Sequence, residues 1–234
     1  MIDRELLKQS AEAVGVSLDD MALDRFELME QRLQRWNEHT NLTAITEPDE
    51  IVIKHFADSL TVLGAVDIPQ GAQVADVGCG AGFPGLPLLC ARPDLELSFI
   101  DSVGKKLSFI REMLKYEGLF GEVLHERAEE LGQSGDYRES YDIVVSRAVA
   151  AMNELCEYCL PLVKVGGVFV AMKGVQDEAE LGANAIATLG GEIDRIVPVE
   201  LPNGDKRNLV IIKKISQTPT KYPRRAKKIT SKPL

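Results

Sequence analysis

The chain has 234 residues, of which 45% are hydrophobic and 27% are charged, and its net charge of −9 argues at first against nucleic acid as a partner. This composition suits one sizeable globular domain, with or without a helical extension, rather than a disordered chain. No apolar run reaches the ~18 residues of a transmembrane helix, the first residues lack a secretory pattern, and four cysteines are too few for a disulfide scaffold, so we expect a protein of the reducing cytoplasm without membrane contact.

Residues 1–68 are predicted to form a small helical cap. Apolar side chains recur there with the three- and four-residue spacing of one helix face, at Phe26, Met29, Leu33 and Trp36. Asp19 or Asp20 is suited to cap this helix, because a short acidic side chain accepts hydrogen bonds from free backbone amides. The Asn- and Thr-rich segment 37–46 is typical of a turn, and helical periodicity resumes after Pro48, a residue type favoured at helix starts.

Strands and helices are predicted to alternate over residues 69–215. Short apolar segments predict strands at 74–77, 95–100, 122–125, 141–146 and 167–172. Amphipathic segments predict helices at 84–91, 104–116, 154–163 and 178–189. Two further strands, 193–201 and 208–215, flank a hairpin turn signal at 202–205. Such alternation implies right-handed crossovers, so we expect a Rossmann-like, doubly wound and mostly parallel α/β sheet with an antiparallel C-terminal hairpin.

The charge is distributed unevenly along the chain. Residues 216–234 contain six Lys or Arg residues and no acid, a charge of +6, which leaves −15 on the rest of the chain. A basic tail on an acidic body is typical of contact with a polyanion, although a solvated, frayed terminus has the same composition. Both interpretations stay open on charge alone.

A glycine-rich loop follows the first predicted strand, with the sequence Asp76-Val77-Gly78-Cys79-Gly80-Ala81-Gly82-Phe83-Pro84-Gly85. Its Gly80-x-Gly82-x-x-Gly85 part matches the dinucleotide pattern, with Asp101 about 20 residues later. The whole of Asp76-x-Gly78-x-Gly80-x-Gly82 matches the S-adenosylmethionine motif of class I methyltransferases. A carboxylate suits the ammonium and sulfonium of that cofactor, whereas a pyrophosphate prefers a helix start without one. The loop therefore favours S-adenosylmethionine, with NAD or an empty glycine turn as alternatives.

Two more acidic positions follow predicted strands. Asp101 ends the second strand, where a carboxylate accepts hydrogen bonds from both ribose hydroxyls or else caps the helix that starts near Val103. Ala128 and Glu129 follow the third strand, where an amide and a carboxylate frame an adenine edge or simply begin an acidic helix. Because the carboxyl ends of parallel strands meet at one edge of the sheet, these groups are expected to share a crevice with the glycine loop.

Four stretches carry a family resemblance, namely Trp36-Asn37-Glu38-His39-Thr40-Asn41-Leu42-Thr43-Ala44-Ile45, His55-Phe56-Ala57-Asp58-Ser59-Leu60, the glycine loop, and Ser146-Arg147-Ala148-Val149-Ala150. Met172-Lys173-Gly174 and Lys221-Tyr222-Pro223-Arg224-Arg225 extend it. On these residues the chain resembles, over nearly its whole length, the bacterial RsmG (GidB) family of 16S ribosomal RNA guanine-N7 methyltransferases. It departs from the family after Arg225, where Ala226-Lys227-Lys228 stands in place of a glycine.

The resemblance implies an S-adenosylmethionine site and a substrate in 16S rRNA or the small ribosomal subunit. We also expect a monomer. With the residue-level argument, the resemblance predicts cofactor contacts at Asp76, Gly78, Gly80, Gly82, Phe83, Asp101, Ala128, Glu129 and Arg147. Arg147 is also expected to reach RNA, since its planar guanidinium suits oxyanions, although a plain salt bridge is the alternative. The candidate RNA contacts are Arg147, Lys173, Arg207, Arg224 and Arg225.

Methyl transfer to guanine N7 requires no general base, because N7 has an in-plane lone pair and no proton. A catalytic dyad is therefore not expected, and the three histidines have no evident Asp or Cys partner. His39 and His55 are interpreted as structural hydrogen-bonding residues, with RNA contact as the alternative. Cys156-x-x-Cys159 is interpreted as a helical core face, so no metal is expected. An NAD-binding oxidoreductase and a methyltransferase of small molecules remain alternative functions.

Overall fold

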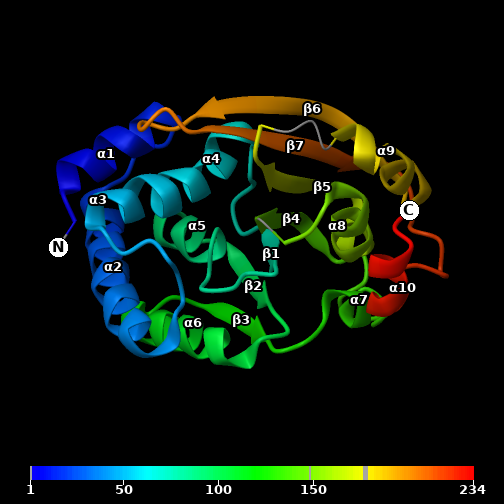
Figure 1. Ribbon diagram of the computed structural model, residues 1–234, viewed down its shortest axis with the longest axis horizontal. Helices are drawn as coiled ribbons and strands as arrows, with labels where there is room; N and C mark the ends of the chain where they lie inside the picture. The colour runs from blue at the N-terminus through cyan, green and yellow to red at the C-terminus, as the bar shows by residue number, and fades with distance from the viewer. Residues whose placement is uncertain (1, 148, 176–178) are drawn as a thin grey trace.

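The computed structural model describes residues 2–147, 149–175 and 179–234, and these form one seven-stranded sheet with helices on both faces (Figure 1). Its strands are β1 (Gln73–Val77), β2 (Glu96–Ile100), β3 (Gly121–Leu124), β4 (Tyr141–Arg147), β5 (Val163–Lys173), β6 (Gly191–Glu200) and β7 (Lys206–Lys214). They lie in the order β3-β2-β1-β4-β5-β7-β6. β1 to β5 run parallel, whereas β7 pairs antiparallel with β5 and β6. The predicted fold class is confirmed.

Helices cover both faces of the sheet. They are α5 (Gly85–Ala91), α6 (Gly104–Glu117), α7 (Ala128–Leu131), α8 (Met152–Cys159) and α9 (Ala179–Thr188). Side chains alternate between the faces of a strand. In β4, therefore, Ile143 and Val145 join a hydrophobic cluster with the cap, α5 and α6, whereas Val144 joins a second cluster with α8 and α9. Both clusters are built from the apolar periodicity visible in the sequence.

The region after α8 differs from the sequence prediction. α8 ends at Cys159, a 3₁₀ turn η2 (Leu160–Leu162) follows, and β5 has begun at Val163, four residues before the predicted strand. Pro161 explains the early end, since proline has no N–H and cannot continue a helix. The predicted start of the next helix, Glu178, lies outside the described residues.

The cap consists of α1 (Arg4–Ala13), α2 (Asp20–Thr40), α3 (Pro48–Ile51), a π-helical turn η1 (Val52–Ala57) and α4 (Asp58–Ala65). Asp19 caps α2, because its side chain accepts a hydrogen bond from the Ala22 amide at 2.7 Å. Pro48 begins α3 as predicted. The π-helical turn was not predicted, because apolar periodicity does not distinguish it from an α-helix.

The predicted turn 37–46 is wrong in its first part, because α2 continues to Thr40. The helix ends where Asn41 takes a left-handed conformation with φ of 49°, which asparagine tolerates better than most residues. Asn37 uses its side chain from within the helix: it donates to the Thr43 carbonyl and accepts from the Thr43 amide, both at 2.9 Å. The polar residues thus stabilise a short loop that begins later than expected.

The C-terminal segment is not a frayed terminus. It crosses α8 and ends in α10 (Ala226–Ser231), on the side of the molecule opposite the cap (Figure 1). Ile229 and Tyr222 are buried there. Arg138 donates to the carbonyls of Thr218 at 2.6 Å and Tyr222 at 2.8 Å. The interpretation as a solvated end is therefore wrong, because contacts distant in sequence hold this segment in place.

Candidate cofactor and RNA site

The glycine loop joins β1 to α5 in a backbone conformation that requires glycine. Gly78 has φ of +70°, and a Cβ there would lie 2.4 Å from the Val149 side chain. Gly82 has φ of +90°, and a Cβ there would lie 2.5 Å from Leu86. L-residues rarely adopt these conformations. Positive φ and close neighbouring atoms each exclude a side chain at these two positions. The loop backbone can therefore approach a ligand closely.

Asp76 lies in β1 beneath this loop and is completely buried. Its Oδ2 accepts a hydrogen bond from the Gly85 amide at 2.8 Å, which ties the strand to the start of α5. Its Oδ1 is buried and has no hydrogen-bond partner among the described residues. Burial raises the pKa of Asp76 to about 7, although the Gly85 hydrogen bond acts in the opposite direction. A buried acceptor without a partner fits a ligand that brings a cation or donor to this point.

A cleft of about 410 Å³ opens at the carboxyl ends of β1, β2 and β4. The predicted cofactor residues that line it are Gly78, Gly80, Asp101, Ala128, Glu129 and Arg147. The other three predicted residues, Asp76, Gly82 and Phe83, do not line it and are buried. The sequence argument missed further lining residues, namely Lys106, Arg127, Glu154, Tyr158 and Thr230. Thr230 belongs to α10, so the C-terminal segment completes a wall that local motifs do not reveal.

Asp101 accepts hydrogen bonds from two backbone amides, one just before α6 and one in the glycine loop. Its Oδ1 accepts from the Val103 amide at 2.7 Å, at the start of α6, and its Oδ2 accepts from the Gly80 amide at 2.8 Å. The carboxylate therefore links β2 to the glycine loop. A carboxylate oxygen can accept two hydrogen bonds, and each oxygen of Asp101 accepts one here. Both oxygens therefore keep capacity for a ligand in the cleft.

Phe83 packs against the cap instead of facing the cleft. Its ring stacks on His55, with centroids 4.3 Å apart and planes inclined by 16°. The structure therefore places the Phe83 ring against the cap and not among the residues that line the cleft. His55 is itself buried, in line with a structural hydrogen-bonding role, whereas the His39 side chain is 81% exposed.

Arg147 ends β4 and lines the cleft, but its guanidinium is bound to the cap. Nη1 lies 3.0 Å from Asp58 Oδ2, and Nη2 lies 3.3 Å from His55 Nδ1. Arg207 approaches the same carboxylate, with Nε 3.4 Å from Asp58 Oδ1. Two candidate RNA-binding arginines thus meet at one buried aspartate of the cap.

Two candidate RNA contacts have internal partners instead. Lys173 is buried and donates to the Ala150 carbonyl. Arg224 is bound by the fully buried Glu157, with Nη2 2.5 Å from Oε2 and its backbone amide 2.7 Å from Oε1. Lys173 is therefore shielded from solvent, and the guanidinium of Arg224, whose side chain is 13% exposed, is engaged by Glu157.

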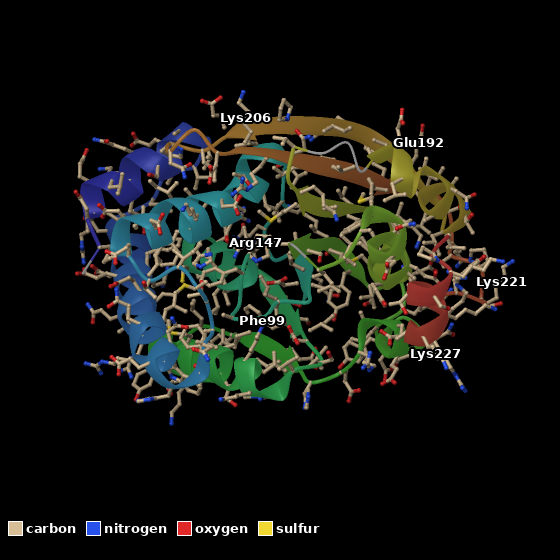
Figure 2. All side chains as sticks on the ribbon, in the orientation of Figure 1. Phe99, Arg147, Glu192, Lys206, Lys221 and Lys227 are labelled. Atoms are coloured by element: carbon tan, nitrogen blue, oxygen red, sulfur yellow. The ribbon has the colours of Figure 1, made fainter. Side chains whose placement is uncertain are left out.

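The C-terminal segment carries several exposed cations. They are Lys221, Arg225, Lys227, Lys228 and Lys232. Figure 2 shows Lys221 and Lys227 pointing outward from this end of the molecule. α10, which carries Lys227 and Lys228, also contributes Thr230 to the lining of the cleft.

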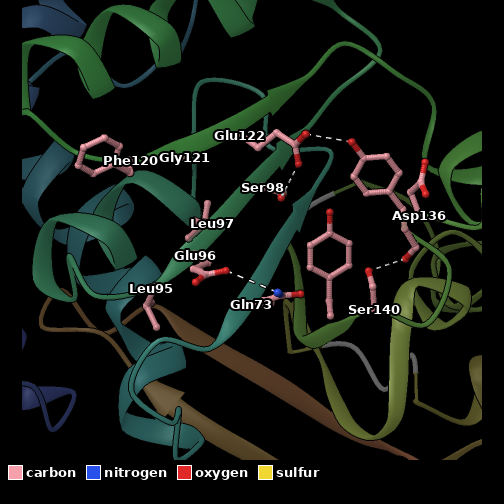
Figure 3. A pocket seen from close by; sticks show the side chains of 12 residues that line it. Gln73, Leu95, Glu96, Leu97, Ser98, Phe120, Gly121, Glu122, Asp136 and Ser140 are labelled. Atoms are coloured by element: carbon pink, nitrogen blue, oxygen red, sulfur yellow. Dashed lines mark hydrogen bonds between the residues drawn. The ribbon is translucent and has the colours of Figure 1, made fainter.

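A second pocket, of about 330 Å³, lies at the opposite edge of the sheet (Figure 3). Its charged lining residues are acidic, namely Glu96, Glu122 and Asp136. Glu122 accepts a hydrogen bond from the Tyr137 hydroxyl at 2.9 Å. This acidic lining is unsuited to phosphate, so the cleft at the carboxyl ends of the strands is the candidate site for cofactor and RNA.

The described part of the chain contains no helix that is both long and apolar enough to cross a membrane. Within the same residues, no group of three His, Cys, Asp or Glu side chains is arranged to hold a metal ion. Cys156 and Cys159 are buried, and burial raises the pKa of both thiols.

Solved methyltransferase structures share the fold. A SAM-dependent methyltransferase from Aquifex aeolicus superposes with a TM-score of 0.55 at 19% identity, covering 74% of this chain and 97% of that one. TrmN from Thermus thermophilus superposes with a TM-score of 0.54 at 18% identity, covering 70% of this chain and 53% of that one. At these identities the likeness concerns the fold alone.

Sequence comparison identifies the family. The model of the GidB family, described as rRNA small subunit methyltransferase G, matches residues 22–210. A protein named Ribosomal RNA small subunit methyltransferase G from Alkaliphilus oremlandii is 45% identical over 99% of this chain and 98% of its own length. One of the same name from Acetivibrio thermocellus is 45% identical over 99% of this chain and 96% of its own. The chain therefore belongs to the GidB family of rRNA small subunit methyltransferases, as its glycine loop and its Asn-Leu-Thr segment predicted.

Proposed function

We propose that this protein is an S-adenosylmethionine-dependent methyltransferase that modifies N7 of a guanine in 16S ribosomal RNA. The observation that carries the cofactor assignment is the cleft that the glycine loop and Asp101 line at the carboxyl ends of the strands, with the Oδ1 of Asp76, buried and unpartnered among the described residues, beneath the loop. An ammonium supplies the donor and the charge that this oxygen lacks. The names of the relatives support the RNA substrate.

The residues of the cleft suit the parts of this cofactor. Asp76 and the glycine loop would hold its aminoacyl end, Asp101 its ribose, and the start of α7 at Ala128 and Glu129 its adenine. A dinucleotide fits less well, because its pyrophosphate would lie close to the Asp76 carboxylate. When bound, S-adenosylmethionine supplies an electrophilic methyl group; the chain holds the guanine in line with it and excludes water.

Labelled S-adenosylmethionine and small-subunit rRNA test this function directly. We expect incorporation of one methyl group that maps to N7 of a single guanine, and we expect that guanine to be unmodified in cells without this protein. Naked rRNA and assembled small subunits are to be compared as substrates. Binding of NAD in preference to S-adenosylmethionine, or methylation of a small molecule alone, would contradict the proposal.

Replacing Asp101 with alanine is expected to weaken S-adenosylmethionine binding by about 1–3 kcal/mol, the scale of hydrogen bonds to a charged group. The variant loses the ribose acceptor and also frees the Gly80 amide. Calorimetry on the folded variant measures the change. Asp136→Ala, at the opposite edge of the sheet, is the matched control and should bind normally. Unchanged affinity in Asp101→Ala would remove Asp101 from the site.

Replacing His39 or His55 with alanine is expected to keep the methyl-transfer rate within ~100-fold of wild type at saturating RNA, because N7 carries no proton to remove. Burial, and next the Arg147 cation, lowers the pKa of His55 to about 3. The single-turnover rate should therefore show no His55 titration between pH 5 and 8. A larger loss with cofactor and RNA binding intact would argue for a base after all.

Replacing Arg225, Lys227 and Lys228 with alanine is expected to weaken the binding of target RNA and of unrelated RNA to the same extent. Phosphate contacts add affinity without base selection. Each lost contact should therefore reduce the slope of log K against the logarithm of the salt concentration by ~0.7 to 0.9. Arg224 stays in place, so α10 remains docked and cofactor affinity should not change. RNA affinity measured against salt checks this, and parallel lines for both proteins would rule out a phosphate-binding role for α10.

A further inference from the structure

The π-helical turn η1 and Asp58, the first residue of α4, present polar groups of the cap toward Arg147 at the end of β4. The Lys54 carbonyl accepts from Arg147 Nη1 at 3.2 Å, and the Asp58 carboxylate accepts from the same nitrogen at 3.0 Å. π-helical turns often occur at functional sites. Here the turn and the first residue of α4 together hold one side chain of the core.

His55 also contacts the Arg147 guanidinium. A guanidinium only donates, so the neutral His55 accepts at Nδ1 and carries its proton on Nε2. Nε2 then donates to Thr43 Oγ1 at 2.7 Å. The Thr43 backbone is in turn held by the Asn37 side chain. Arg147 thus sets the tautomer of His55, and the Asn-Leu-Thr loop orients the imidazole ring through the Thr43 hydroxyl.

Phe83 provides the third side of this arrangement. Its ring stacks on His55, and Arg147 Cζ lies 5.2 Å from its centroid. Because Phe83 belongs to the glycine loop, the arginine is positioned by the cap and by the cofactor loop together. A planar guanidinium held on an aromatic face and by several acceptors has little rotational freedom.

The arginine keeps donors for a ligand. Of its five N–H groups, two on Nη1 and one on Nη2 have acceptors, whereas Nε and the second Nη2 proton have none among the described residues. The side chain is 16% exposed and lines the cleft. Such a group suits an oxyanion, either the carboxylate of the cofactor or a phosphate of the RNA.

We propose that Asp58 and His55 are positioning residues of the methyltransferase: they hold Arg147 at the cleft so that its free N–H groups meet an oxyanion of the bound reactants. This role rests on the proposed function. It gives the helical cap a part in the reaction, because the cap supplies three of the groups that orient a residue of the core. A misplacement of about 1 Å in such a group costs on the order of 100-fold in rate.

A double-mutant cycle tests whether Asp58 acts through Arg147. Arg147→Ala is expected to lower the single-turnover rate about 100-fold and Asp58→Asn about tenfold or more, whereas the double variant should lose no more than Arg147→Ala alone. Added guanidinium ion should partly restore Arg147→Ala but not the double variant. The matched control is Asp142→Asn, which removes an ion-paired carboxylate at the other end of β4 and should keep full activity.

Additive losses, or equal rescue of both variants by guanidinium, would overturn the positioning role. If Asp58→Asn fails to fold, Thr43→Val serves in its place, since it removes the hydroxyl that accepts from His55 Nε2 and from the Ile45 amide. Its smaller loss should vanish in the Arg147→Ala background. The same double-mutant cycle can be measured with the Kd for S-adenosylmethionine in place of the rate, and this second cycle needs no RNA. A wild-type protein that leaves small-subunit rRNA unmodified would contradict the proposed function, whereas an active wild type with additive losses contradicts the positioning role alone.

Discussion

Replacing Glu157 with alanine is expected to lower the free energy of unfolding by about 3–5 kcal/mol, the scale for removing one partner of a buried ion pair. Glu157 is fully buried in α8 and binds Arg224 through both carboxylate oxygens, with Nε 2.8 Å from Oε1 and Nη2 2.5 Å from Oε2. Without it, the Arg224 amide, Nε and Nη2 lose their acceptors, and only Nη1 keeps one, the Lys232 carbonyl. Denaturant unfolding measures the loss directly, and α10 should become susceptible to protease.

An apolar double replacement is the control for this prediction. Glu157→Leu combined with Arg224→Met removes both charges at once, and such a change is often close to neutral. Glu50→Ala, which breaks an exposed pair with Lys54, should change stability little. Because Thr230 of α10 lines the cleft, Glu157→Ala should also weaken cofactor binding. Unfolding free energies equal to wild type would mean that the C-terminal segment docks without this pair.

The affinity for S-adenosylmethionine is expected to fall as the pH is lowered from 7 to 5, by up to about tenfold per pH unit. Burial raises the pKa of Asp76 to about 7, so below that pH the carboxyl group is largely protonated before the cofactor binds. The cofactor ammonium favours the ionised form, and binding must then release a proton. Calorimetry in buffers of different ionisation enthalpy measures both the affinity and the released proton.

The variant Asp76→Asn separates this effect from other titrations. It resembles the protonated carboxyl group, so it should bind weakly at pH 7 and show little further pH dependence. Asp136→Asn, at the acidic pocket on the opposite edge, should keep the wild-type profile. A wild-type affinity that is constant between pH 5 and 7 would show that Asp76 does not meet the ammonium.

Local sequence determined the fold class and the position of the site. Apolar periodicity located the strands, and side-chain alternation in β4 assigned its residues to the two hydrophobic clusters. The glycines of the loop were predictable because their conformation excludes any side chain at Gly78 and Gly82. Asp101 was placed at the cleft by its position at a strand end, where parallel strands direct their carboxyl ends to one edge.

Only the tertiary structure decided which charges are free to act. Arg147 meets Asp58 and His55 across 89 and 92 residues, and Arg224 meets Glu157 across 67. No local pattern encodes these pairings, since composition counts a cation alike whether it is exposed or bound to a buried carboxylate. The sequence therefore predicted a basic terminus but not its docking, and a cofactor arginine but not the cap that holds it, because both depend on contacts formed only when distant segments pack together.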